Sequence, residues 1–145
     1  MNNPTYTNHR TLLPCMVLLA SAALHAQAID IHWAKPVSGE WDLTKNWAEG
    51  FIPNGNDHAM LGLEGAYTVT VNRDTSLLSL SIPNPDASID IMPMSTLDMY
   101  VSFHNEGQIR IDPLQGKARA ELWFRNALEI TGGGQVTLGS PDALL

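Results

Sequence analysis

Apolar and polar residues alternate in short segments along most of the chain. Residues 67–71, 78–82, 89–91, 97–103, 109–111, 128–130 and 136–138 show this pattern. Alternation places successive side chains on opposite faces of a β-strand. Prolines and glycines separate the segments, so the pattern predicts many short strands joined by turns. Residues 116–127 are the only stretch that could form a helix, and their Leu-Trp-Phe cluster fits a strand better.

The strands also repeat along the chain. Three asparagines recur every 21 residues, and apolar residues stand two and four positions before each of them. A repeat of this length with alternating side chains predicts an all-β parallel β-helix, or β-solenoid, with coils of about 21 residues. A leucine-rich repeat is set aside because its pattern requires an apolar residue where Asp98 and Arg119 stand. We expect Ile82, Phe103 and Phe124 to stack inside successive coils.

The repeated asparagines are Asn84, Asn105 and Asn126. A side-chain amide at a turn can donate to one coil and accept from the next, so stacked asparagines would form a ladder. The alternative is that asparagine is simply common in turns. The repeat favours the ladder.

The N-terminal residues have the pattern of a secretory signal peptide. Arg10 precedes an apolar run from residue 12 to residue 24, and Ala26-Gln27-Ala28 fits a cleavage site. The run is too short to span a bilayer of about 30 Å. We therefore expect residues 1–28 to be removed and the protein to be secreted or displayed on the cell surface.

Charge and cysteine content narrow the function further. The chain carries 8 Lys and Arg against 15 Asp and Glu, and its single cysteine, Cys15, lies in the predicted signal peptide. Residues 29–145 therefore have no disulfide to close the fold. The acidic balance argues against a nucleic-acid partner and against tight binding to an anionic membrane.

A tryptophan-rich block, residues 39–59, is the most distinctive string. It reads Gly-x-Trp-x4-Asn-Trp-x2-Gly-x2-Pro-x3-Asp-x-Ala. It resembles the N-terminal entry segment of large bacterial secreted β-helix proteins, including autotransporter-passenger-like adhesins. The glycine-then-strand segment at residues 131–140 is similar to the autotransporter-associated repeats. The resemblance implies a β-helix that begins at this block.

The end of a solenoid needs a cap, since strand edges and core side chains would otherwise be open. We expect residues 29–66 to form this cap and residues 67–145 to form solenoid coils that are truncated at residue 145. The alternative use of the tryptophans is a sugar-stacking platform. Asp57 could ligate calcium or cap a turn, and a single carboxylate makes a poor calcium site. The predicted cap residues are Trp33, Trp41, Asn46, Trp47, Gly50, Pro53 and Asp57.

The chain lacks the motifs of common enzymes. Residues 132–134 form a glycine run without the following Lys-Ser/Thr of a phosphate loop, and the three remaining histidines lack metal-ligand spacing. We expect no catalytic residue, metal or cofactor. The alternative is a polysaccharide lyase or hydrolase, with Arg110 and Lys117 or Arg119 as acid-base or substrate-clamping groups.

The sequence thus predicts an exported, non-enzymatic, adhesion-type module of a larger bacterial surface or secreted protein. Expected partners are cell-surface glycans or further copies of the chain. Membrane attachment is expected only through a C-terminal anchor or barrel beyond residue 145. Residues 135–145 end in apolar side chains, so we expect the chain alone to self-associate.

Overall fold

The computed structural model describes residues 27–116, 118–126 and 129–145. Strands dominate these residues, and the short 3-10 helix η1 (Thr44–Asn46) is the one helical element among them. No helix in the described ranges is both long and apolar enough to cross a membrane. The predicted signal peptide lies outside the described residues except for Gln27 and Ala28, and Lys117 also lies outside them.

The strands form two parallel sheets. The first sheet has the order β1 (Asp30–His32), β3 (His58–Met60), β5 (Thr75–Ile82), β7 (Thr96–Asn105), β9 (Ala120–Phe124) and β12 (Ala143–Leu144), with β10 (Glu129–Thr131) also pairing with β7. The second sheet has the order β11 (Gln135–Leu138), β8 (Gln108–Ile111), β6 (Ala87–Ile91), β4 (Tyr67–Val71) and β2 (Gly39–Glu40). From β3 to β8 the chain alternates between the sheets, and each strand pairs in parallel with the strand one lap away. This confirms the predicted β-solenoid.

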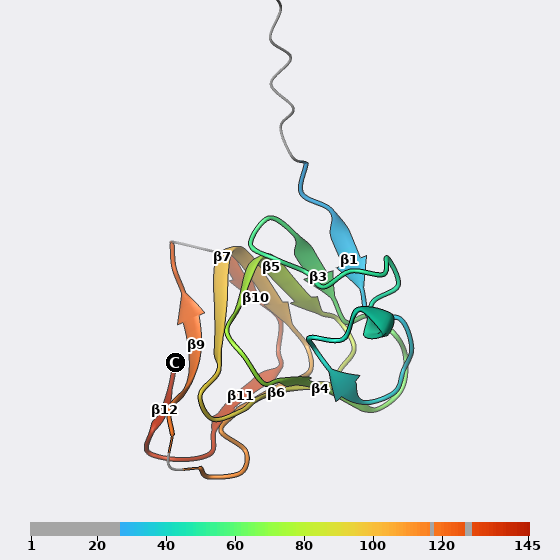
Figure 1. Cartoon of the computed structure of the whole chain (residues 1–145). Coiled ribbons are helices and arrows are strands. Elements are labelled where there is room, and N and C mark those ends of the chain that lie inside the picture. Colours follow the sequence, from blue (N-terminus) through green and yellow to red (C-terminus); the bar gives the residue numbers. More distant parts are fainter. Residues whose placement is uncertain (1–26, 117, 127–128) are drawn as a thin grey trace, which may run out of the picture.

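The first sheet is bent by a bulge in β7. Leu77 lies opposite Met99 and Ser79 lies opposite Ser102, so Leu78 faces two residues of β7. In the next coil, β9 pairs with the part of β7 before the bulge, residues 96–99, and β10 pairs with the part after it, residues 102–104. The two halves and the second sheet make three sides, and Figure 1 shows the chain winding around a roughly triangular outline.

Alternate side chains point into this triangle and form a continuous core. On the second sheet, Val69, Ile89 and Ile109 lie in one parallel register, and all three are fully buried. On the first sheet, Leu80 lies opposite Phe103, and both are buried. The alternation in the sequence therefore identified the inward face of most strands correctly.

The predicted 21-residue register is wrong for most of the first sheet. Leu80, not Ile82, lies opposite Phe103, and Phe124 lies opposite Met99. Adjacent coils are offset by 21 residues between β3 and β5, by 22 to 23 between β5 and β7, and by 25 between β7 and β9. The bulge and longer turns add these residues, and Val101, the apolar residue four positions before Asn105, is consequently 50% exposed.

The same shift removes the predicted asparagine ladder. Asn105 lies opposite Ile82, so it does not stack on Asn84. The Asn84 amide nitrogen instead donates to the backbone carbonyls of Leu63 (2.6 Å) and Gly65 (2.8 Å) in the preceding coil. Asn84 is buried, and its side chain links its own coil to the backbone of the preceding coil.

The other two asparagines also bind backbone rather than each other. The amide nitrogen of Asn105 donates to the carbonyl of Gln135 in the following coil at 3.3 Å. The exposed Asn126 donates to the carbonyl of Tyr100 at 3.2 Å. The turn asparagines thus satisfy carbonyls at corners where strand pairing stops, without forming one column.

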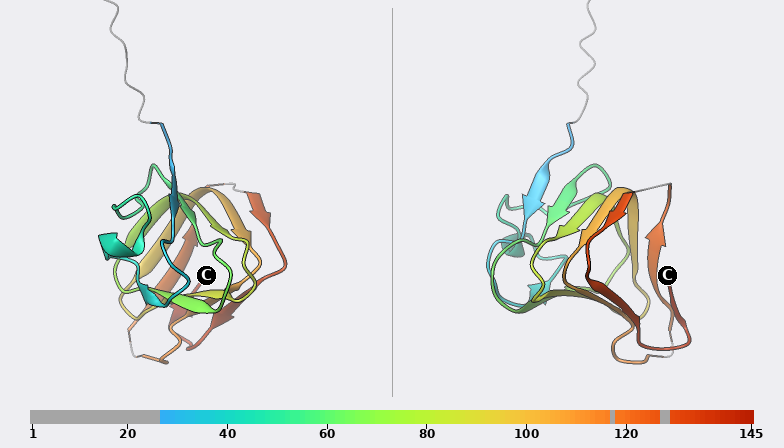
Figure 2. Two further views of the ribbon diagram at one scale, coloured as in Figure 1. Left: turned by 90° about the vertical axis from the view of Figure 1, so that its right-hand side faces the viewer. Right: turned by 180° about the vertical axis from the view of Figure 1, so that it is seen from behind.

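Residues 33–57 lie at the β1 end of the stack, where Figure 2 shows them in front of the sheets in the left-hand view. They cover the outer edge of β1. The backbone N–H of Ala48 donates to His32, the Glu49 carboxylate accepts from the His32 N–H, and Trp33 and Trp47 form an antiparallel bridge. Edge groups that would be free in a bare first coil are therefore paired, which supports the predicted capping role.

Candidate functional site

The three tryptophans of the entry block are buried side by side. Trp33, Trp41 and Trp47 are each at most 3% exposed. The ring of Trp47 meets Trp33 edge-on at 5.1 Å between centroids and Trp41 at 4.7 Å. The indole N–H of Trp33 donates to the carbonyl of Val37, and that of Trp47 donates to the carbonyl of Trp41. These rings fill the first coil, so the alternative of a sugar-stacking platform is wrong for them.

The polar and turn residues of the block hold its loops in place. The side chain of Asn46 donates to the carbonyl of Glu40 at 2.8 Å. Gly50 has a φ of 80°, which favours glycine. Pro53 is buried, and the Asp57 carboxylate accepts from the backbone and the side chain of Asn54. Asp57 therefore caps a turn, which is the role that the sequence analysis set against calcium binding.

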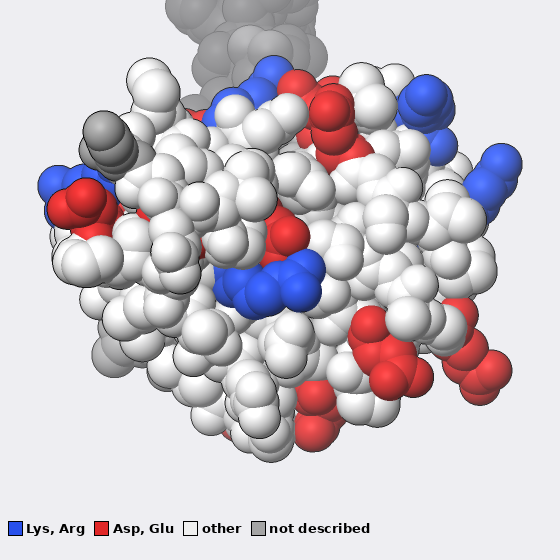
Figure 3. Space-filling model, turned by 90° about the horizontal axis from the view of Figure 1, so that it is seen from below, with Lys and Arg blue, Asp and Glu red and all other residues white. Residues whose placement is uncertain are grey.

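The two arginines considered for catalysis, Arg110 and Arg119, are paired with acids. Arg110 on β8 binds Asp90 on β6 at 2.5 Å, and Arg119 binds Glu121. Figure 3 shows the face seen from below, over the second sheet, as mostly uncharged with one basic and one acidic group in contact near its middle. The Arg110–Asp90 pair joins register partners on adjacent strands and so contributes to coil pairing, whereas Arg119 and Glu121 lie on the same segment.

The three histidines that the structure describes, His32, His58 and His104, share one outer face, which the sequence analysis missed. His32 and His104 lie in one cross-strand row, with Met60 and Ser81 between them, and His58 lies in a neighbouring row. The sequence does not display the residue offsets between coils, and without them the shared face of the histidines could not be predicted. Within the residues that the structure describes, no group of three or more His, Cys, Asp or Glu side chains could hold a metal ion.

Trp123 on β9 is the tryptophan that faces solvent. The strand points Ala120 and Leu122 inward, so Trp123 points outward and is 37% exposed. The alternation Ala-Glu-Leu-Trp-Phe carries this information, but the apolar character of Trp123 and Phe124 together obscured it. Tryptophan is enriched at protein interfaces, because its indole offers an apolar ring together with a polar N–H.

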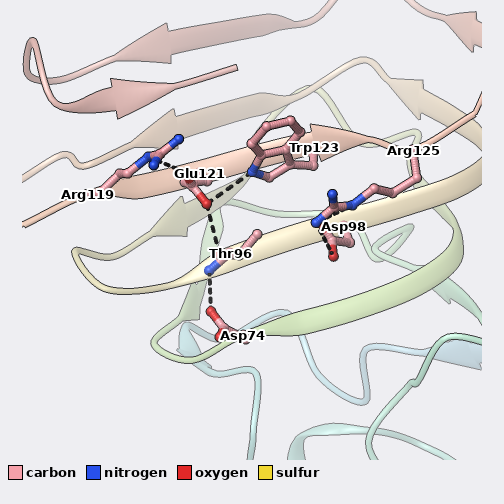
Figure 4. Close-up of polar contacts among 7 residues, drawn as sticks. All are labelled: Asp74, Thr96, Asp98, Arg119, Glu121, Trp123 and Arg125. Carbon is pink, nitrogen blue, oxygen red and sulfur yellow. Dashed lines mark hydrogen bonds and ion pairs between the residues drawn. The ribbon is translucent and has the colours of Figure 1, made fainter.

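Neighbouring charged side chains fix the position of the Trp123 ring (Figure 4). Its N–H donates to the Glu121 carboxylate at 3.0 Å, and the Arg125 guanidinium lies 4.9 Å from the ring centroid. Arg125 in turn donates two hydrogen bonds to Asp98 on β7, at 3.0 and 3.1 Å. Hydrogen bonding to Asp98 raises the pKa of Arg125. We call Asp98, Glu121, Trp123 and Arg125 the Trp123 cluster.

The Trp123 cluster extends across the coils. The Thr96 hydroxyl donates to Glu121 at 3.4 Å, and the Thr96 backbone N–H donates to Asp74 at 3.0 Å. Asp74, in the turn before β5, is thereby linked with residues of β7 and β9 on one outer surface, as Figure 4 shows. The arrangement presents an aromatic ring and hydrogen-bonding groups in fixed positions, which suits binding of a polar ligand with an apolar face.

Comparison of the chain with protein-family models, curated proteins and solved structures finds no match.

Proposed function

We propose that this protein is an exported, adhesion-type β-solenoid module of a bacterial surface or secreted protein, which binds glycans without cleaving them. The observation that carries the proposal is the Trp123 cluster. It combines a partly exposed indole with guanidinium and carboxylate groups on a rigid parallel scaffold. Sugars bind proteins through an apolar ring face and peripheral hydroxyls, and this surface offers partners for both.

Catalysis is the competing function, because two carboxylates lie beside the ring. Asp98 pairs with Trp123 in the strand register, and Glu121 lies on the same outer face of β9. Glycoside hydrolases use two carboxyl groups, one of which must supply a proton. Here Asp98 binds Arg125 and Glu121 binds Arg119. Both carboxylates are thus engaged by arginines, which supports binding over hydrolysis.

The proposal is tested by measuring attachment of the purified protein to immobilised bacterial and plant polysaccharides. We expect Trp123→Ala to reduce binding at least about tenfold, since loss of one stacking ring removes more than about 1.4 kcal/mol. Trp123→Phe should retain a ring and part of the binding. Phe51→Ala is the matched control, because Phe51 is another exposed aromatic, outside the cluster.

Equal binding by wild type and Trp123→Ala would contradict the assignment of this surface. Export is tested separately by mass spectrometry of the extracellular protein. We expect Ile29 as the new N-terminus after cleavage at Ala28. An extracellular protein that retains Met1 would contradict the predicted leader.

A further inference from the structure

A second surface feature lies in the entry block, away from the Trp123 cluster. It is a hollow of about 280 Å³ between the segment that follows β1 and the helix η1. Its volume is near the lower end for small-molecule sites, which matches a single sugar ring. The residues that line it, here called the lysine hollow, are Trp33, Ala34, Lys35, Val37, Lys45 and Asn46.

The walls of the lysine hollow are held by hydrogen bonds. The Ala34 N–H donates to the carbonyl of Asn46 at 2.8 Å, which joins the two segments. The indole of Trp33 donates to Val37 at 3.1 Å and so fixes the first wall. The Asn46 side chain donates to Glu40, which fixes the second. The hollow is therefore built before any ligand arrives, and little ordering is needed on binding.

The charges around the lysine hollow differ from those elsewhere on the chain. The arginines in the described ranges all lie within 4.0 Å of a carboxylate, in the pairs Arg73–Asp42, Arg110–Asp90, Arg119–Glu121 and Arg125–Asp98. Lys35 and Lys45 have no such partner among the residues that the structure describes. Two uncompensated cations thus share one hollow of a protein with net charge −7.

We propose that the lysine hollow binds the carboxylate of an acidic sugar, such as a uronic acid residue of a glycan. Lys35 and Lys45 supply two ammonium groups for the carboxylate. Val37, which is 59% exposed, supplies an apolar wall for the ring face. The side-chain oxygen of Asn46 accepts no hydrogen bond from the described residues and is available to a sugar hydroxyl.

This assignment deepens the proposed function. It rests on that function because it takes a glycan as the natural ligand. It also explains how an acidic protein can contact an acidic glycan. The overall charge repels such a polymer, whereas two lysines in one place attract it locally. Binding of a small probe and attachment to polysaccharides can fail independently, so the two proposals are separable.

The experiment titrates methyl glucuronide into the ¹⁵N-labelled purified protein and follows the indole N–H of Trp33 and the side-chain amide of Asn46 by NMR. We expect saturable shifts at both groups, and binding that weakens as salt is added. The double variant Lys35→Gln/Lys45→Gln should bind at least about tenfold more weakly. Arg73→Gln, which removes an exposed cation outside the hollow, should bind as the wild type does.

Methyl glucoside and inorganic sulfate separate the contributions of the ring and the charge. We expect each to bind at least about tenfold more weakly than methyl glucuronide, because each lacks one of the two recognised features. Equal binding of methyl glucoside, or of sulfate, would overturn the assignment of a uronic acid. Binding to phosphatidylglycerol vesicles without any glucuronide shift would assign the lysines to a membrane surface and also overturn it.

Discussion

At the scale of single residues, burial decides which aromatic side chains stabilise the protein and which can bind. Trp33, Trp41 and Trp47 are enclosed, whereas Trp123 is not. All four residues are tryptophans, and only their positions in the coils distinguish the buried ones from the exposed one. Phe103 belongs with the enclosed set, because it is 3% exposed and its ring centroid lies 5.6 Å from that of Phe124.

Replacement of Phe103 by alanine tests this packing. We expect Phe103→Ala to lower the free energy of unfolding by about 3–5 kcal/mol, because it removes a large buried ring. Val101→Ala is the matched control on the same strand, since Val101 is half exposed, and it should cost less than about 1 kcal/mol. Urea unfolding measures both. Similar losses for the two variants would mean that β7 does not bury Phe103.

The pair of Glu49 and His32 gives one residue-scale pH dependence. Burial acts to raise the pKa of Glu49, but hydrogen bonds from the His32 side chain and backbone outweigh it and leave the pKa below its ordinary value of 4.5. A carboxyl with a lower pKa in the folded state stabilises the fold above its unfolded pKa. This stabilisation is lost as the pH falls through the folded pKa.

Glu49→Gln should therefore destabilise the protein at pH 7 and have little effect near pH 3. We expect a cost of about 0.5–1 kcal/mol at pH 7, since the pair is partly exposed and screened. The control is Glu64→Gln, an exposed carboxylate that accepts no hydrogen bond from the described residues. Thermal unfolding at the two pH values measures the difference, and an equal cost at both would contradict the account.

At the scale of elements, the sequence predicted strands well and their registration poorly. The segments from 67–71 to 136–138 all contain strands, because period-two alternation is a local signal. The bulge that sets Leu78 against two residues of β7 depends on coil-to-coil pairing, which no local pattern reveals. For this reason the predicted stack of Ile82, Phe103 and Phe124 and the predicted asparagine ladder were wrong. The exposed Trp123 and the lysine hollow required three-dimensional placement as well.

The close contact between adjacent coils at Gly107 leads to a prediction at the element scale. A Cβ on Gly107 would lie 2.3 Å from the carbonyl oxygen of Ala87 and 2.9 Å from that of Asn84, both in the preceding coil. We expect Gly107→Ala to destabilise by about 1–3 kcal/mol, because backbone atoms must move apart. Gly55→Ala, where the nearest atom is 3.8 Å away, should change stability by less than about 0.5 kcal/mol. Chemical denaturation that showed equal effects would contradict this registration.

At the scale of the whole molecule, the two ends of the solenoid differ. The edge of β1 is covered by residues 46–49, whereas inward-facing side chains of the last described coil are exposed. Ile130 is 59% and Leu138 is 51% exposed, although their register partners Phe103 and Ile111 are buried. The strand β11 between residues 135 and 138 carries no charge or proline that would hinder pairing with another strand.

We therefore propose that residues 29–145, expressed alone, self-associate through β10 and β11. Light scattering over a range of protein concentrations should show a rising average mass. Leu138→Lys should reduce this rise, since a charged edge residue opposes strand pairing. A constant monomer mass for the wild-type chain at all concentrations would contradict the proposal.

The central claim is that the solenoid holds glycans without chemical turnover. The most direct measurement incubates the purified protein with polysaccharides and quantifies, in the same samples, the glycan retained on the protein and the new chain ends released. The account predicts retention that depends on Trp123 and no increase in chain ends over a sample without protein. Release of new chain ends in proportion to protein concentration and time, abolished by Asp98→Asn or Glu121→Gln, would contradict it and identify an enzyme.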